Sequence, residues 1–174
     1  MTRIAFAAPE NMTKEQLRVR DIALSSARGV VAGPLHAWLL SPDVAEHAHK
    51  LGAFLGYLSS VPRRIVELSI IVTAMERDCD FAWQAHLPRA IEFGVSLEIT
   101  RALKSGNVPE FNNEDEYTAY EIVTALCRRN QLSDALFASG VEKFGEQGVV
   151  EITALVGFYT MVAMTLNVFG VPDD

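Results

Sequence analysis

Residues 76–90 have the sequence ERDCDFAWQAHLPRA. They contain a cysteine at 79, a tryptophan four positions later and a histidine three positions after that. On an α-helix these spacings place Cys79, Trp83 and His86 on one face, stacked over two turns. A thiol and an imidazole on one helix face are compatible with redox chemistry, with acid–base chemistry or with ordinary packing. The surrounding sequence has to distinguish among these three hypotheses.

The segments on both sides of this stretch carry the start and stop signals of helices, and none shows the long alternation typical of β-strands. Several segments begin with Ser or Thr, namely Thr13, Ser41 and Ser96. Segments end at glycine, namely Gly33, Gly94 and Gly106. The sequence therefore predicts an all-α protein, a bundle of about eight helices in one domain over residues 1–174. We expect N-terminal helices within 13–57, helices that carry the quoted stretch within 61–105, and C-terminal helices within 113–170.

The composition narrows the class of protein. Of the 174 residues, 49% are hydrophobic and 21% are charged, which is typical of a globular domain. The net charge of −7 argues against nucleic acid as a partner, because nucleic-acid binding needs clustered Lys and Arg. The two cysteines do not suggest a disulfide framework and the N-terminus does not resemble a signal peptide, so we expect a cytoplasmic protein.

Residues 152–171 form a run of twenty residues without a charge, which is long enough for a membrane span. The run nevertheless contains three threonines and an asparagine, and its flanks are acidic rather than basic. We interpret it as a helix buried in the core or between subunits, and we expect no membrane partner. A chain of this length has few places to bury a helix that is apolar all round, so the sequence favours a homo-oligomer.

Glu67 is the first candidate for chemistry, because it interrupts an otherwise apolar or hydroxyl-bearing run at residues 65–75. Burying a carboxylate is costly unless it is paired or neutralised. One interpretation is an ion pair with Arg63, Arg64 or an arginine elsewhere. The other is a functional acid or base, since a desolvated glutamate is suited to proton transfer near neutral pH.

The other candidates also have two interpretations. His86 is either a core histidine or a proton shuttle, and Cys79 is either inert or a thiolate favoured by a helix N-terminus, although Asp78 and Asp80 oppose that charge. Trp83 either packs in the core or forms the wall of a pocket. Tyr159 and Asn167 are polar groups that could face a pocket or a subunit interface. His47 and His49 would point to nearly opposite sides of a helix, so we expect no metal site.

The order of these residues resembles the carboxymuconolactone decarboxylase / alkylhydroperoxidase D-like family. That family has a glutamate on one helix, a Cys-x-x-Cys-x-x-x-His stretch on the next, and then a Gly-hydrophobic-Ser/Thr turn. The corresponding residues are Glu67, then Cys79 to His86 in CDFAWQAH, then Gly94-Val95-Ser96. The resemblance implies an all-α, alkylhydroperoxidase D-like bundle that assembles as a trimer or hexamer.

One departure from the family bears on mechanism, because Ala82 occupies the position of the second cysteine. The two-cysteine peroxidase cycle of the family is therefore excluded in its usual form. Cys127 would replace the missing thiol only if the fold brought it within disulfide distance of Cys79. A one-cysteine cycle that uses an external thiol stays open.

The decarboxylase branch of the family needs an acid–base pair and groups that bind a carboxylate. On this resemblance we assign His86 as the proton shuttle, Glu67 as its partner and Trp83 as a pocket residue. The resemblance names no carboxylate-binding residue, and Arg63, Arg64 and Arg89 are the candidates within reach. We expect a cofactor-independent enzyme that decarboxylates or isomerises a small carboxylated lactone or related organic acid.

Two alternatives stay open: a single-cysteine peroxidase that uses Cys79, and a non-catalytic small-molecule-binding protein. The binding protein predicts a closed, dry site in which Glu67 is locked to an arginine. An open pocket that contains Glu67 and His86 would count against it.

Overall fold

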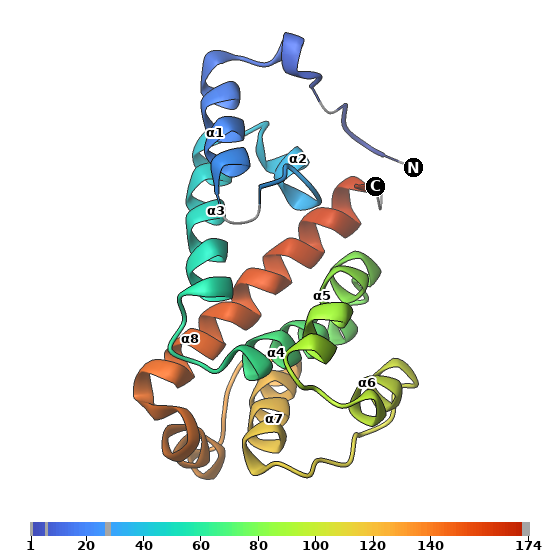
Figure 1. The fold of residues 1–174 in the computed structure, drawn as a ribbon, viewed down its shortest axis with the longest axis vertical. Coiled ribbons are helices and arrows are strands. Elements are labelled where there is room, and N and C mark those ends of the chain that lie inside the picture. The colour runs from blue at the N-terminus through green and yellow to red at the C-terminus, as the bar shows by residue number, and fades with distance from the viewer. Residues whose placement is uncertain (1, 6, 27–28, 172–174) are drawn as a thin grey trace.

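The computed structural model describes residues 2–5, 7–26 and 29–171, and within these ranges the chain is helical, without a strand (Figure 1). The all-α prediction is confirmed. The elements are η1 (Pro9–Asn11), α1 (Lys14–Ser25), α2 (Pro34–Trp38), α3 (Pro42–Tyr57), α4 (Arg63–Glu76), α5 (Asp80–Glu92), α6 (Leu97–Lys104), α7 (Glu114–Arg129) and α8 (Asp134–Phe169).

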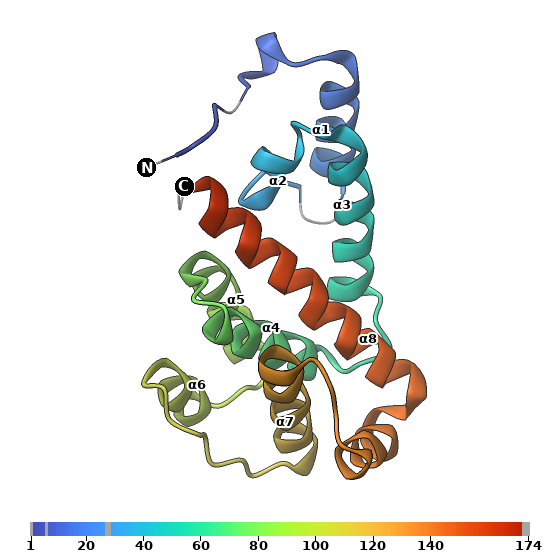
Figure 2. The same ribbon diagram turned by 180° about the vertical axis from the view of Figure 1, so that it is seen from behind.

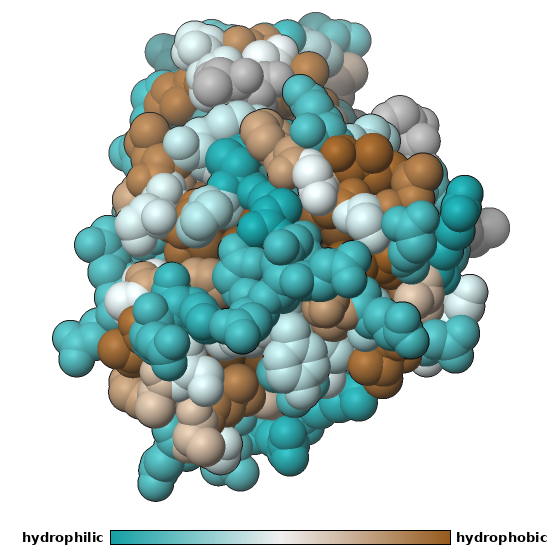
Figure 3. Space-filling model, turned by 60° about the horizontal axis from the view of Figure 1, so that its bottom comes forward, coloured by the Kyte–Doolittle hydropathy of each residue, from teal (hydrophilic) through white to brown (hydrophobic). Residues whose placement is uncertain are grey.

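Two helices organise the structure. The long helix α8 runs diagonally through the molecule, with α1–α3 on one side and α4–α7 on the other, as the front and back views show (Figures 1 and 2). Helix α4 contacts α3, α5, α6, α7 and α8. All ten of its residues at 65–74 are buried, because α4 is surrounded by other helices on every side. The end of the molecule that carries α6 and α7 is mostly hydrophilic, with separate apolar areas (Figure 3).

The helix starts follow the predicted capping residues. The Thr13 hydroxyl accepts a hydrogen bond from the backbone amide of Gln16, and the Gln16 side chain accepts one from the backbone amide of Thr13. Together these two bonds form a complete capping box. Ser96 accepts in the same way from the Ile99 amide, and Pro42 is the first residue of α3. Local sequence therefore determines these helix starts.

The end of α1 differs from the prediction, which extended the helix to Gly33. The helix ends at Ser25. The Ser25 hydroxyl donates to the carbonyl groups of Asp21 and Ile22, and the Ser26 hydroxyl donates to that of Ala23. Serine side chains that bond to backbone carbonyls in this way compete with continuation of a helix.

Helix α8 is interrupted at Gly145, whose φ of 69° and ψ of 168° are not helical. Glycine adopts this conformation without the steric penalty of a side chain. The break separates 134–144 from 146–169, so the apolar segment predicted at 152–171 starts within the second part. Among the described residues, α8 alone is long and apolar enough to cross a membrane. Of its most apolar 18-residue stretch, 61% is buried, as in the core helix of a soluble protein.

Glu151 on α8 holds the connection between α3 and α4. Its Oε2 atom accepts hydrogen bonds from the Ser59 hydroxyl at 2.6 Å and from the Ser60 amide at 2.7 Å, and its Oε1 atom accepts one from Gln147. Burial raises the pKa of Glu151, but the hydrogen bonds from Ser59, Gln147 and Ser60 outweigh it and lower the pKa to about 2. The ionised carboxylate therefore stabilises the folded state.

We expect Glu151→Gln to lower the free energy of unfolding at pH 7 by about 1–3 kcal/mol, because buried hydrogen bonds to a charged acceptor are lost. The wild-type carboxylate stabilises the fold fully above its ordinary pKa of 4.5 and loses that effect as the pH falls towards about 2. Urea unfolding at a series of pH values should therefore show the difference between variant and wild type shrinking below pH 4.5. A stability difference between variant and wild type that does not change with pH would contradict this role of Glu151. Glu114→Gln is the control, because Glu114 forms an exposed ion pair with Lys143.

Candidate functional site

The site is built around the carboxylate of Glu67, which is 1% exposed in the centre of α4. Its Oε2 atom lies 2.7 Å from Nδ1 of His86. Its Oε1 atom lies 2.9 Å from Nη2 of Arg63 and 3.3 Å from Nε of Arg89. The structure thus brings together the predicted Glu67–His86 pair and two of the three predicted arginines.

Helix geometry explains these contacts. Arg63 lies four residues before Glu67 on α4, so the two side chains are neighbours on one helix face. His86 and Arg89 lie three residues apart on α5, which packs against α4. One carboxylate therefore receives a cation from its own helix and two partners from the next helix.

The charges around Glu67 do not cancel. Two guanidinium groups flank a single carboxylate, which leaves a formal charge of +1 when His86 is neutral. Burial lowers the pKa of Arg89, but the charge of Glu67 and a hydrogen bond with Tyr57 outweigh it and raise the pKa. The cluster is consequently suited to an additional anion.

Aromatic rings hold the two arginines. The Cζ atom of Arg63 lies 5.0 Å from the ring centroid of Tyr57 and 4.8 Å from that of Phe93, and Cζ of Arg89 lies 5.3 Å from the Tyr57 centroid. The arginine side chains are 27% and 29% exposed, so this side of the cluster reaches solvent. The Nη1 atom of Arg63 is buried without a hydrogen-bond partner among the described residues.

His86 extends the network to α8. Its Nε2 atom lies 3.0 Å from the hydroxyl oxygen of Tyr159, and the two rings meet edge to face. The Glu67 carboxylate only accepts, so the hydrogen-bond network assigns the His86 proton to Nδ1. In neutral His86 the Nε2 atom is then an acceptor, and the Tyr159 hydroxyl donates to it. The result is a continuous chain of hydrogen bonds from Glu67 through His86 to Tyr159.

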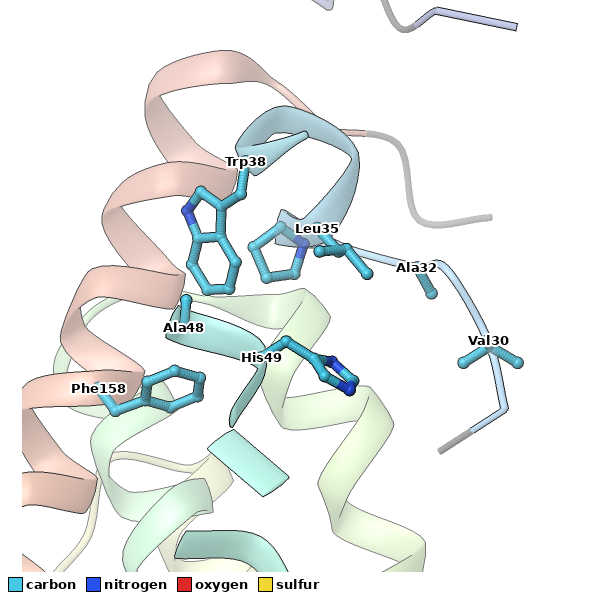
Figure 4. A pocket seen from close by; sticks show the side chains of 8 residues that line it. Val30, Ala32, Leu35, Trp38, Ala48, His49 and Phe158 are labelled. Atoms are coloured by element: carbon cyan, nitrogen blue, oxygen red, sulfur yellow. The ribbon is translucent and has the colours of Figure 1, made fainter. Parts of the chain in front are cut away.

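His86 and Tyr159 line a small cavity of about 40 Å³. The other lining residues are Pro34, Trp38, Phe81, Ala82, Ala85, Phe158 and Val162. A second cavity of about 40 Å³ shares Pro34, Trp38 and Phe158 with the first and extends to His49 and Val30 (Figure 4). Each cavity has room for little more than water, so a substrate fits only if the residues that line the cavity move apart.

Trp38 lines both cavities and is held by a hydrogen bond. Its indole N–H donates to the Thr165 hydroxyl at 2.9 Å, which ties α2 to α8. Its ring also meets Phe158 edge to face, with centroids 6.1 Å apart. The walls beside His86 and Tyr159 are therefore mainly aromatic and aliphatic.

Arg64 lies outside the Glu67 cluster. Its Nη2 atom is 2.7 Å from Asp115 and its Nη1 atom is 2.6 Å from Glu116, both at the start of α7. Glu116 is 2% exposed and needs a nearby cation. Arg64 therefore joins α4 to α7, and its predicted role in binding a substrate carboxylate has no support in this geometry.

Cys79 and Trp83 are buried, at 3% and 4% exposure, but neither lines the cavity next to His86. The Trp83 ring lies 5.4 Å from Nζ of Lys104 on α6. The cavity face of α5 instead carries Phe81, Ala82 and Ala85. His86 lies at the boundary between these two faces, which is why the spacing from Cys79 to His86 suggested a shared face.

The two thiols do not form a disulfide, and both are buried. Burial raises the pKa of the Cys127 thiol, which fits the small hydrophobic residue expected from the sequence. Within residues 2–5, 7–26 and 29–171, no group of three or more His, Cys, Asp or Glu side chains is placed to hold a metal ion.

No protein-family model matches this chain, and no curated protein matches it. The family resemblance therefore rests on the residues from Glu67 to Ser96. Tyr159 was indicated by the sequence only as a polar group in an apolar helix. Its place at the end of the His86 chain depends on the packing of α8 against α5.

We expect Glu67→Gln to lower the free energy of unfolding by about 3–5 kcal/mol, because it leaves two arginines beside a neutral amide. Equilibrium unfolding in urea measures this difference. Glu76→Gln is the matched control, since Glu76 lies on the same helix and pairs with Arg128 at the surface. That control should change stability by about 1 kcal/mol or less, and equal effects of the two substitutions would show that Glu67 is not a structural anchor.

Proposed function

We propose that this protein is an acid–base enzyme of the carboxymuconolactone decarboxylase-like family. Its substrate is a small carboxylated lactone or a related organic acid, which it decarboxylates or isomerises without a cofactor. The observation that carries the proposal is the hydrogen-bonded chain Glu67–His86–Tyr159, which ends in a cavity with apolar walls. A carboxylate, an imidazole and a hydroxyl in series are suited to moving one proton at the cavity surface.

In this proposal Tyr159 is the group that meets the substrate. Loss of CO₂ breaks one carbon–carbon bond and leaves its electron pair in a dienolate. In the reacting state solvent has protonated Nε2 of His86, so Nε2–H donates to the Tyr159 oxygen and the Tyr159 hydroxyl turns towards the substrate. The Tyr159 hydroxyl then protonates the dienolate at carbon, His86 passes its Nε2 proton to the phenolate, and solvent protonates His86 again. Each decarboxylation thus consumes one proton, while Glu67 keeps Nδ1–H of His86 oriented and stabilises the imidazolium whenever both nitrogens carry protons.

Arg89 is the preferred partner of the substrate carboxylate. It is part of the positively charged cluster at Glu67, and it interacts electrostatically with Tyr159. Arg63 is the second candidate, because its buried Nη1 atom is a donor without a hydrogen-bond partner in the described structure. Neither arginine lines the cavity at His86 and Tyr159, so a substrate whose carboxylate is bound by Arg89 has to extend past Glu67 to reach the Tyr159 hydroxyl.

A second candidate, the non-catalytic small-molecule-binding protein, is favoured by one observation. Glu67 is locked to two arginines and buried, and the adjoining cavity is nearly closed, as that hypothesis predicts. Against it, His86 and Tyr159 do line a cavity. The single-cysteine peroxidase is less well supported, because Cys79 is 3% exposed and does not line that cavity.

The decisive experiment measures CO₂ release and deuterium incorporation from D₂O with a panel of small carboxylated lactones. We expect Tyr159→Phe and His86→Ala to lower kcat by about 10²–10⁴-fold, the usual contribution of acid–base catalysis. Arg89→Lys should raise KM more than it lowers kcat, because a bidentate contact is lost. Cys79→Ser is the control and should leave kcat unchanged.

Two outcomes would replace the proposal. Loss of turnover in Cys79→Ser, with Glu67→Gln unaffected, would establish thiol chemistry instead. Substrate binding by calorimetry with no turnover, and with equal affinity for wild type and Tyr159→Phe, would establish a binding protein.

A further inference from the structure

Between Val150 and Asn167, the face of α8 opposite the catalytic residues is largely exposed and carries no charge. Beyond the break at Gly145, exposed positions lie at Val150, Thr153, Gly157, Met164 and Asn167, and the half-buried Thr160 and Met161 fill the interval between Gly157 and Met164. Val150 is 67% exposed and Met164 is 61% exposed. This spacing forms one continuous stripe along the helix, the pattern that packs against another helix.

Two neighbouring grooves lie beside this stripe. One, of about 660 Å³, is lined by Leu126, Leu132, Asp134, Phe137, Val149, Val150, Thr153 and Ala154. The other, of about 260 Å³, is lined by Arg77, Leu126, Asn130, Thr153, Val156, Gly157 and Thr160. They share Leu126 and Thr153, so together they follow α8 along α7. Both are larger than the cavity at His86.

We propose that a second copy of this chain docks on this surface, with the two α8 helices antiparallel and crossing at Gly157. A two-fold axis there places Val150 of each copy towards Met164 of the other, so apolar residues meet on both sides of the crossing. No atom lies within 4 Å of a Cβ built on Gly157. The missing side chain allows the two helix backbones to approach closely.

The charges at the ends of the surface support a copy of the chain rather than another occupant. Asp134 lines one groove and Arg77 lines the other, and neither forms an ion pair within the described part of the chain. A two-fold axis at Gly157 places each groove of one copy against the other groove of the second copy. Each Asp134 then approaches the second copy's Arg77, which gives two identical ion pairs. In a two-fold interface, every contact between one residue of the first copy and another residue of the second copy occurs a second time with the two copies interchanged.

Arg77 is already positioned at that surface. Its Nε atom donates to the Thr160 hydroxyl at 3.1 Å, and Asn167 donates to its backbone carbonyl. The guanidinium is thus held beside the stripe before any partner binds. The inference is independent of the proposed function, because Tyr159 lies on the buried side of α8, where His86 of α5 contacts it. A two-fold surface yields a dimer, or a hexamer when combined with a three-fold interface elsewhere.

The test is sedimentation equilibrium of the full chain, with Gly157→Glu and Gly56→Glu as a matched pair. Gly56 on α3 also has open space at its Cβ position, so both substitutions add the same side chain to a helix without a clash. We expect Gly157→Glu to dissociate the assembly to half its mass or less, because two carboxylates face each other at the axis. Gly56→Glu should keep the wild-type mass, and circular dichroism should show unchanged helicity in both.

Charge reversal tests the arrangement of the two copies. Arg77→Glu and Asp134→Arg should each weaken association at least about tenfold, and the double variant Arg77→Glu/Asp134→Arg should restore it. A wild-type monomer at about 100 μM would overturn the proposal, as would a Gly157→Glu variant with unchanged mass. Failure of the double variant to restore association would also overturn it, and a monomer that takes up an apolar dye in the groove would identify a ligand site instead.

Discussion

The buried carboxylate of Glu67 is the constraint on which the rest of the site depends. An isolated charge in the middle of α4 would be strongly unfavourable, and three side chains compensate it. Satisfying that charge fixes the start of α4 through Arg63 and the position of α5 through His86 and Arg89. His86 in turn fixes Tyr159 on α8. One electrostatic requirement thus orients three helices and arranges an acid–base chain.

Two other buried glutamates serve the same purpose elsewhere. Glu116 at the start of α7 pairs with Arg64 of α4. Glu151 on α8 accepts hydrogen bonds from the connection between α3 and α4. Each of the three acids joins elements distant in sequence, and each requires specific donors, whereas apolar contacts tolerate many arrangements. The helices around α4 are therefore positioned by directional contacts as well as by burial of apolar surface.

The acid–base chain and the arginine cluster meet at Glu67, but they face different surroundings. Tyr159 lies against an aromatic cavity, and the arginines reach solvent between Tyr57 and Phe93. A substrate with one carboxylate and a compact apolar body would match both surroundings. Trp38, whose indole donates to Thr165, forms part of the wall on the apolar side. The opposite face of α8 is open, which separates the chemistry from the proposed contact between copies.

The sequence by itself determined the features that depend on near neighbours. Thr13 and Ser96 mark helix starts because a cap satisfies amides only three residues away. The composition of residues 152–171 predicted a buried helix, and one side of α8 is buried in this way while the other side is exposed. Glu67 and His86 stood out as polar residues within apolar surroundings. These features were predicted because their physical causes lie within a few residues of each other along the chain.

Only the tertiary structure decided which distant groups meet. The sequence offered three arginines for Glu67, and packing selected Arg63 and Arg89 while the acids at the start of α7 took Arg64. Tyr159 reached His86 across 73 residues of chain. Cys79 and Trp83 turned towards the core, since Ala82 and Ala85 form the face of α5 at the cavity. Such choices depend on how helices cross, and that is set by all their buried surfaces together and not by any local spacing.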